Sequence, residues 1–86
     1  MRPMSTTSTV TMYSRRRCGL CDKARAVILA ERDRLERPFG FEEVFIDGDD
    51  DLERGYGLRV PVVLIGGEEA FEYRVDPEQL RRLVEG

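Results

Sequence analysis

Two cysteines separated by two residues are the part of this 86-residue sequence best suited to covalent chemistry. Cys18 and Cys21 follow three consecutive arginines, Arg15, Arg16 and Arg17, at the predicted start of a helix. Side chains three residues apart share one helix face, with Cβ atoms about 5–6 Å apart. A disulfide needs Cβ atoms about 3.5–4.5 Å apart, so a small adjustment interconverts dithiol and disulfide. The spacing therefore predicts a reversible two-electron switch.

The position at a helix start predicts that one of the two thiols is reactive. Unpaired backbone N–H groups and the positive end of the helix dipole both favour a thiolate there. A free thiol has a pKa of about 8.5, whereas a Cys-x-x-Cys nucleophile titrates near about 7 or below. We expect Cys18 to be the nucleophile and Cys21 the resolving thiol, which attacks the mixed disulfide. The arginines have two interpretations, support of the thiolate with attraction of anionic substrates, or a solvated loop.

Composition limits the classes of protein to which the chain can belong. The length fits one small domain, which we place at residues 9–86 after a flexible polar tail at residues 1–8. The net charge of −3 argues against nucleic acid as the main partner. The chain contains no histidine, which excludes a Cys–His catalytic pair. Lys23 is interpreted either as a group that biases the resolving thiol or as a surface lysine.

The sequence also carries information on location. No apolar run approaches the roughly 20 residues needed to cross a bilayer, so no membrane partner is expected. The first nine residues are polar and lack the apolar core of a secretory signal. We therefore expect a cytoplasmic monomer. In that compartment two cysteines this close argue for redox or metal chemistry over a structural disulfide.

Seven elements are predicted around the cysteine pair. Strands are expected at residues 9–13, 41–46 and 60–65, with a return strand contained within residues 68–74. Helices are expected from residue 19 to about residue 37, after the acidic turn to about Tyr56, and from Asp76 onward. The inward positions of the helices are listed here: Leu20, Ala24, Val27, Ile28 and Leu35 in the first, and Leu80, Leu83 and Val84 in the last. In the first helix Glu31 is expected to face water, and Ala70 or Phe71 and Tyr73 are expected to turn partly inward.

Turn and cap residues separate these elements. Pro38 and Gly40 end the long helix, Gly66-Gly67 predicts a hairpin, and Asp76-Pro77 is a favourable helix start. The acidic run 47–51 does not fit a calcium-binding loop, because leucine stands where that loop needs glycine and its bidentate glutamate. The run is interpreted as a turn that caps a short helix, and no metal site is predicted.

The order β-α-β-α-β-β-α predicts an α/β fold with a four-stranded mixed sheet and helices on both faces. The second strand is expected at an edge of the sheet. The strand at residues 60–65, which is the most apolar stretch, is expected in the centre.

The motif Tyr13-Ser14-Arg15-x-x-Cys18-x-x-Cys21, followed by Arg59-Val60-Pro61 and a Gly-Gly hairpin, resembles the glutaredoxin family of the thioredoxin superfamily. More narrowly, it is similar to small bacterial glutaredoxin-like proteins. The resemblance runs from about Thr9 to the C-terminus. It implies a thioredoxin-like (glutaredoxin) fold and thiol–disulfide oxidoreductase activity with a redox-active Cys18–Cys21 disulfide.

The resemblance also implies roles for substrate-binding residues. Pro61 would be cis, with the backbone N–H and C=O of Val60 offered to a thiol substrate. Arg15 stands where family members carry a cation that pairs with a glutathione carboxylate, and Asp76 would inherit part of the glutathione site, although helix capping also explains it. The chain departs from the family pattern at Cys-Gly-Leu-Cys and at Arg59 in place of threonine. It also departs before the last helix, where the family's glutathione-holding segment, Gly-Gly and then Cys or Ser followed by Asp-Asp, is absent.

The expected substrate is a disulfide in a protein or in a small molecule. Glutathione or another low-molecular-weight thiol is the expected co-substrate, or a thioredoxin-type reductase the electron donor, and no cofactor is required. Two alternatives stay open at this point. One is an iron–sulfur or metal carrier that uses Cys18 and Cys21 in a dimer, and the other is a binding module without turnover.

Overall fold

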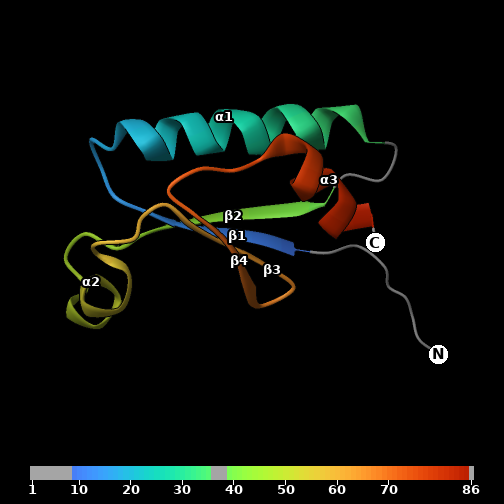
Figure 1. The fold of residues 1–86 in the computed structure, drawn as a ribbon. Coiled ribbons are helices and arrows are strands. Elements are labelled where there is room, and N and C mark those ends of the chain that lie inside the picture. The colour runs from blue at the N-terminus through green and yellow to red at the C-terminus, as the bar shows by residue number, and fades with distance from the viewer. Residues whose placement is uncertain (1–8, 36–38, 86) are drawn as a thin grey trace.

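The computed structural model describes residues 9–35 and 39–85, and its elements follow the predicted order (Figure 1). The tail predicted at residues 1–8 lies outside the described residues. The elements are β1 (Thr9–Ser14), α1 (Gly19–Arg34), β2 (Gly40–Phe45), α2 (Asp50–Tyr56), β3 (Val62–Ile65), β4 (Glu68–Glu72) and α3 (Pro77–Glu85). No helix in the described part of the chain is long and apolar enough to span a membrane.

The four strands form one mixed sheet in the order β2-β1-β3-β4. β1 pairs in parallel with β2 and antiparallel with β3, and β3 pairs antiparallel with β4. The predictions of an edge position for β2 and a central position for β3 are confirmed. β1, α1 and β2 form a βαβ unit, in which α1 carries the chain back along the sheet so that β2 runs parallel to β1.

Helices cover both faces of the sheet, as predicted. Val10 and Met12 of β1 face α1 and belong to a core with Ile28 and Leu80, none of which is exposed. Side chains alternate along a strand, so Tyr13 points to the opposite face, where its ring stacks on Tyr56 of α2 at 4.3 Å. Figure 1 shows α1 and α3 above the sheet and α2 at its far side near one end.

The inward face of α1 differs from the prediction at two positions. Ala24 and Ile28 are buried, but Leu20 is 46% exposed, so its prediction was wrong. Leu20 lies in the first turn, where Cys21 takes the buried position. Glu31 is only 4% exposed, although it was predicted to face water. Its carboxylate accepts hydrogen bonds from Arg34 and from Arg81 of α3, and these partners replace the water that it loses.

α1 ends at Arg34, earlier than the predicted end near Arg37, which lies outside the described residues. Leu35 is extended, and its N–H donates to the carbonyl oxygen of Arg32. The Leu35 side chain packs against the core. Leu35 was thus correctly predicted to turn inward, but it does so as the residue that ends the helix.

The β3–β4 hairpin turns through Gly66 and Gly67, both at positive φ, as the Gly-Gly pair predicts. An irregularity between Val63 and Leu64 lets Ala70 and Phe71 both become half-buried. β4 runs from Glu68 to Glu72, within the segment that was expected to contain the return strand. Tyr73 was expected to turn partly inward, but it has φ 68° and is 45% exposed.

α3 begins as predicted and buries a narrower stripe than predicted. Asp76 Oδ1 accepts hydrogen bonds from the N–H groups of Glu78 and Gln79, which is the geometry of a helix N-cap. Leu80 is buried and Val84 packs against the core. Leu83 is 43% exposed, so the prediction that it is buried was wrong: a helix that lies against the core with one edge shelters only the residues on that edge.

Candidate active site

Four loops meet at one end of the sheet, and this end carries the cysteine pair. Ser14, the last residue of β1, pairs with Phe45, the last residue of β2. The first residue of β3, Val62, pairs with Tyr13 of β1 and with Glu72, the last residue of β4. The loops at residues 15–18, 46–49, 57–61 and 73–76 therefore leave the sheet at the same end.

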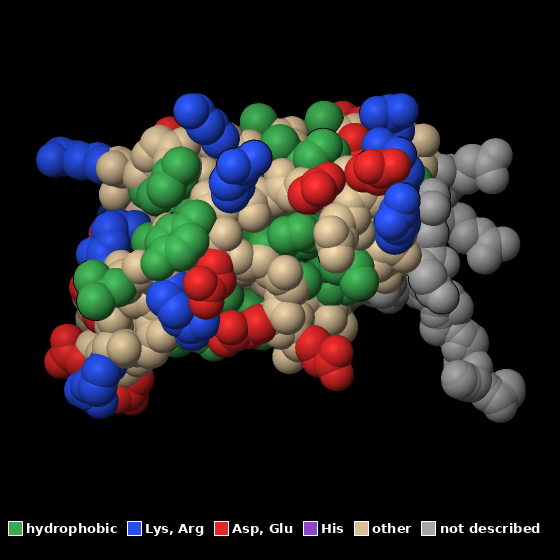
Figure 2. Space-filling view, viewed as in Figure 1, with side chains coloured by type: hydrophobic (Ala, Val, Ile, Leu, Met, Phe, Trp, Pro, Cys, Tyr) green, Lys and Arg blue, Asp and Glu red, His purple; other side chains and the backbone are tan. Residues whose placement is uncertain are grey.

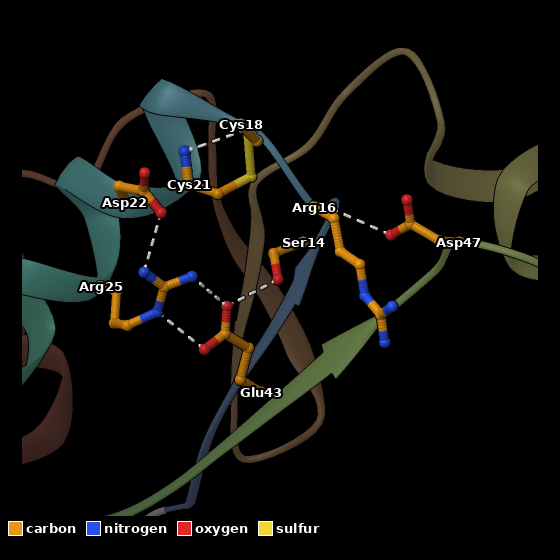
Figure 3. A network of polar contacts seen from close by, with 8 residues as sticks. All are labelled: Ser14, Arg16, Cys18, Cys21, Asp22, Arg25, Glu43 and Asp47. Carbon is orange, nitrogen blue, oxygen red and sulfur yellow. Dashed lines mark hydrogen bonds and ion pairs between the residues drawn. A yellow bond between two sulfur atoms is a disulfide. The ribbon is translucent and has the colours of Figure 1, made fainter.

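Cys18 and Cys21 form a disulfide at the start of α1 (Figure 3). Cys18 is the N-cap residue, with φ −118° and ψ 107°, and its Cα lies 5.2 Å from that of Cys21. Cys21 has no exposed surface, whereas Cys18 is partly exposed. The structure thus leaves one sulfur accessible and places the other beneath it.

The backbone at the helix start contacts the accessible sulfur directly. The N–H of Cys21 donates to Cys18 Sγ at 3.1 Å, in the position that a serine or aspartate oxygen takes at other helix starts. The carbonyl oxygen of Cys18 accepts the first hydrogen bond of the helix, from the N–H of Asp22 at 3.0 Å. When the disulfide is reduced, this arrangement favours negative charge on Cys18 Sγ over Cys21 Sγ.

Two of the three arginines before Cys18 contact other elements. Arg15 forms an ion pair with Glu53 of α2 at 3.3 Å, and its guanidinium also donates to the carbonyl oxygen of Gly57. The backbone N–H of Arg16 donates to Asp47 Oδ1, and its guanidinium lies 5.5 Å from the centre of the Phe45 ring. Arg15 therefore attaches the loop to α2, and this position differs from that of a free cation awaiting a glutathione carboxylate.

The Val60–Pro61 peptide bond is cis, as the resemblance implies. The carbonyl oxygen of Pro61 accepts a hydrogen bond from the N–H of Tyr73 at 2.9 Å. This bond joins the loop that carries the cis proline to the segment between β4 and α3. Pro61 is buried and Val60 is partly exposed.

Arg59, which stands in place of the family's threonine, holds the end of α2 to β4. Its guanidinium pairs with Glu69 at 2.9 Å and with Glu72 at 2.7 Å, and it lies 5.3 Å from the centre of the Tyr56 ring. The hydrogen bond from Arg59 holds the pKa of Glu69 below its ordinary value. Sequence reasoning noted Arg59 only as a departure, since its acidic partners lie on a strand ten or more residues away.

Asp76 caps α3 through Oδ1. Among the described residues, the Asp76 side chain makes no further hydrogen bond that would support the glutathione-binding role implied by the resemblance. Capping accounts for the hydrogen bonds that this carboxylate makes.

A network beside the disulfide was missed by sequence reasoning (Figure 3). Arg25, one turn after Cys21, donates two hydrogen bonds to Glu43 of β2 and one to Asp22. The Ser14 hydroxyl, which is fully buried, donates to Glu43 Oε2 at 2.7 Å. The hydrogen bond from Arg25 lowers the pKa of Glu43 and outweighs its desolvation, so this carboxylate stays ionised. The alternation of β2 could have shown that Glu43 faces α1, but not which cation it meets.

No group of three or more His, Cys, Asp or Glu side chains within residues 9–35 and 39–85 is arranged to hold a metal ion. A metal or cluster on the cysteine pair would therefore need ligands from outside this part of the chain.

Comparisons with known proteins agree with this geometry. The model of the glutaredoxin-like domain (DUF836) matches residues 9–85. A crystal structure of protein XcR50 from X. campestris is 40% identical, with a TM-score of 0.69 over 85% of this chain and 91% of that one. The solution structure of Ne2328 from Nitrosomonas europaea is 26% identical, with a TM-score of 0.77 over 98% of this chain and 99% of that one.

The fold extends to more distant proteins. A mutant thioredoxin from Halobacterium salinarum is 23% identical, with a TM-score of 0.60 over 91% of this chain and 72% of that one. No curated protein matches the chain.

Proposed function

Because the chain belongs to the glutaredoxin-like domain family of the thioredoxin superfamily, we propose that it is a thiol–disulfide oxidoreductase whose centre is Cys18 and Cys21. The thioredoxin-like fold with a cysteine pair at a helix start is that of a redox module. The observation that carries the proposal is the hydrogen bond from the Cys21 N–H to Cys18 Sγ, combined with full burial of Cys21.

The reaction begins with the reduced pair. The Cys18 thiolate attacks one sulfur of a substrate disulfide, forms a mixed disulfide, and expels the other substrate sulfur as a thiolate, which takes up a proton. Cys21 then loses its proton and attacks Cys18 Sγ. This step forms the Cys18–Cys21 disulfide and releases the second substrate thiol, so the substrate gains two electrons and the protein loses two.

Two molecules of a low-molecular-weight thiol return the pair to the dithiol and are themselves oxidised to a disulfide, or a thioredoxin-type reductase supplies the two electrons. Glutathione is one candidate for that thiol. The engagement of Arg15 with Glu53 favours substrates that do not depend on a carboxylate contact at Arg15. No cofactor takes part in this cycle.

The test combines a titration with an activity comparison. Iodoacetamide labelling of the reduced protein at graded pH, read by mass spectrometry, should show that Cys18 ionises well below about 8.5 and that Cys21 does not. The rate of insulin reduction is then compared with the rate of hydroxyethyl disulfide reduction in the presence of glutathione. This comparison should distinguish thioredoxin-like from glutaredoxin-like activity.

Two serine variants provide the controls. Cys18→Ser should lose turnover with every disulfide, and Cys21→Ser should accumulate a mixed disulfide with the substrate, visible as an added mass. Ordinary titration of Cys18, or turnover by Cys18→Ser, would refute the proposed function.

A further inference from the structure

A hollow of about 370 Å³ lies between the first turns of α1, the helix that starts at the cysteine pair, and the segment before α3. Its apolar or aromatic lining is listed here: Leu20, Ala24, Val27, Tyr73 and Val75. Figure 2 shows hydrophobic side chains next to basic ones on this face of the molecule. The volume is sufficient for one large aliphatic or aromatic side chain from another molecule.

The hollow adjoins the cysteine pair through two of its walls. Leu20 lies between Cys18 and Cys21 in the chain and is 46% exposed. Tyr73 is joined to the cis proline by the hydrogen bond from its N–H to the Pro61 carbonyl oxygen, and its hydroxyl donates to the carbonyl oxygen of Leu58, which is 92% exposed. The exposed apolar surface of Leu20, Tyr73 and Leu58 therefore borders the site of reaction.

Two cations line the same hollow without a carboxylate partner. Lys23 and Arg74 are exposed and form no ion pair among the described residues. Arg17, beside Cys18, also forms none. By contrast, most other described arginines bind carboxylates: Arg15, Arg25, Arg34, Arg54, Arg59, Arg81 and Arg82.

The nearby acidic groups do not neutralise these cations. Asp22 pairs with Arg25, Glu72 pairs with Arg59, and Asp76 caps α3. The chain has a net charge of −3, so two cations without carboxylate partners at one apolar hollow stand out. They favour binding of an anionic ligand.

We propose that this hollow binds the segment next to the disulfide of a protein substrate, with an apolar side chain inside and adjacent carboxylates on Lys23 and Arg74. The inference rests on the proposed function, since it names the substrate class of that same site. It assigns specificity to residues outside the Cys-x-x-Cys motif, and it makes the preferred substrate an acidic, apolar peptide segment.

The test uses peptide disulfides that are identical except beside the cysteine. One carries leucine and two glutamates, one carries leucine and two lysines, and one carries glycine and two glutamates. Exposed ion pairs contribute about 0.2–1 kcal/mol each, so with two such pairs the acidic leucine peptide should exceed the basic one by about two- to thirty-fold in kcat/KM at low salt. The ratio should fall in about 0.5 M salt. The glycine peptide should be reduced several-fold more slowly than the leucine peptide.

The matched variants are the double substitution Lys23→Gln with Arg74→Gln, and Arg82→Gln as a control. Arg82 is an exposed cation on α3 that pairs with Glu78 and does not line the hollow. The double variant should lose the preference for the acidic over the basic peptide, whereas Arg82→Gln should retain that preference and the native rate with uncharged hydroxyethyl disulfide. Equal rates for acidic and basic peptides, or an unchanged preference in the double variant, would overturn the inference.

A cysteine-free form of the acidic peptide separates the two proposals. Titrated into the oxidised protein, it should shift the NMR amide signals of Lys23, Tyr73 and Val75, and the basic form should not. Absence of these shifts with hydroxyethyl disulfide still reduced would reject the hollow as a binding site and leave the redox function standing. Shifts without any turnover would reject the redox function and leave the binding site.

Discussion

At the residue scale, the partner of each charged side chain decides what that side chain can do. Arg15 and Arg59 belong to the motif that carries the family resemblance, but both are held by glutamates of other elements. Lys23, an unremarkable surface lysine in the sequence, is free of any such partner among the described residues and lines the hollow. A cation's place in the motif is therefore a poor guide to whether it is available to a substrate.

Glu43 carries the first prediction at this scale. Glu43→Gln should destabilise the protein by about 1.5–3 kcal/mol near pH 7, because it weakens charged hydrogen bonds from Arg25 and Ser14 to a side chain that is only 15% exposed. The pKa of Glu43 is lowered in the folded protein, so its contribution is present above the ordinary value of 4.5. It is lost as the pH falls through the lowered pKa.

Urea unfolding of the native protein and of Glu43→Gln, from neutral pH to below the lowered pKa of Glu43, measures the loss of stability. The difference in unfolding free energy between the native protein and Glu43→Gln should shrink in acid, where Glu43 is protonated. Glu42→Gln is the matched control, since Glu42 is the exposed neighbour on the same strand. A difference between the native protein and Glu43→Gln that does not change with pH would contradict the ionic role of Glu43.

At the element scale, α3 buries one of its two leucines in the core and leaves the other exposed. Leu80 is buried in the core, whereas Leu83, three residues on, is 43% exposed. Leu80→Ala should lower the free energy of unfolding by about 2–5 kcal/mol through lost burial and a cavity. Leu83→Ala should cost less than about 1 kcal/mol, because water already contacts this side chain.

Denaturant unfolding of the two leucine variants decides between the predicted and the observed stripe of α3. Similar large losses for both variants would mean that α3 lies deeper against α1 than described. Because α3 follows the segment that carries Tyr73, Arg74 and Val75, a loosened α3 should also weaken binding of the acidic peptide.

At the scale of the whole molecule, the inner strands β1 and β3 hold the two parts of the site in fixed positions. Each is hydrogen-bonded on both sides, whereas β2 and β4 are edges and α2 contains no buried residue. Native-state hydrogen exchange should therefore be slowest in β1 and β3, faster in the edge strands, and fastest in α2. Slowest exchange in α2 or β2 would show that stability is distributed differently from burial.

The type and order of the helices and strands were predictable because they follow from local sequence patterns. Apolar alternation and helical spacing identified the strands and helices, and caps such as Asp76 and the Gly66-Gly67 turn placed several of their ends. The Cys-x-x-Cys spacing located the centre of the site, and the family resemblance anticipated the cis bond at Pro61. The errors fell on Leu20, Glu31, Tyr73 and Leu83, side chains whose exposure depends on what another element covers.

The sequence by itself determined the order of the elements, the position of the cysteine pair at a helix start, and the identity of its accessible sulfur as Cys18. Only the tertiary structure decided which charges are neutralised and which surfaces meet. Lys23 and Arg74 are about fifty residues apart in the chain and come together because α1 and the segment before α3 lie at the same end of one sheet. Local spacing governs backbone conformation over a few residues, whereas ion pairing and hollows depend on contacts between distant ones, which the pattern of a single segment cannot encode.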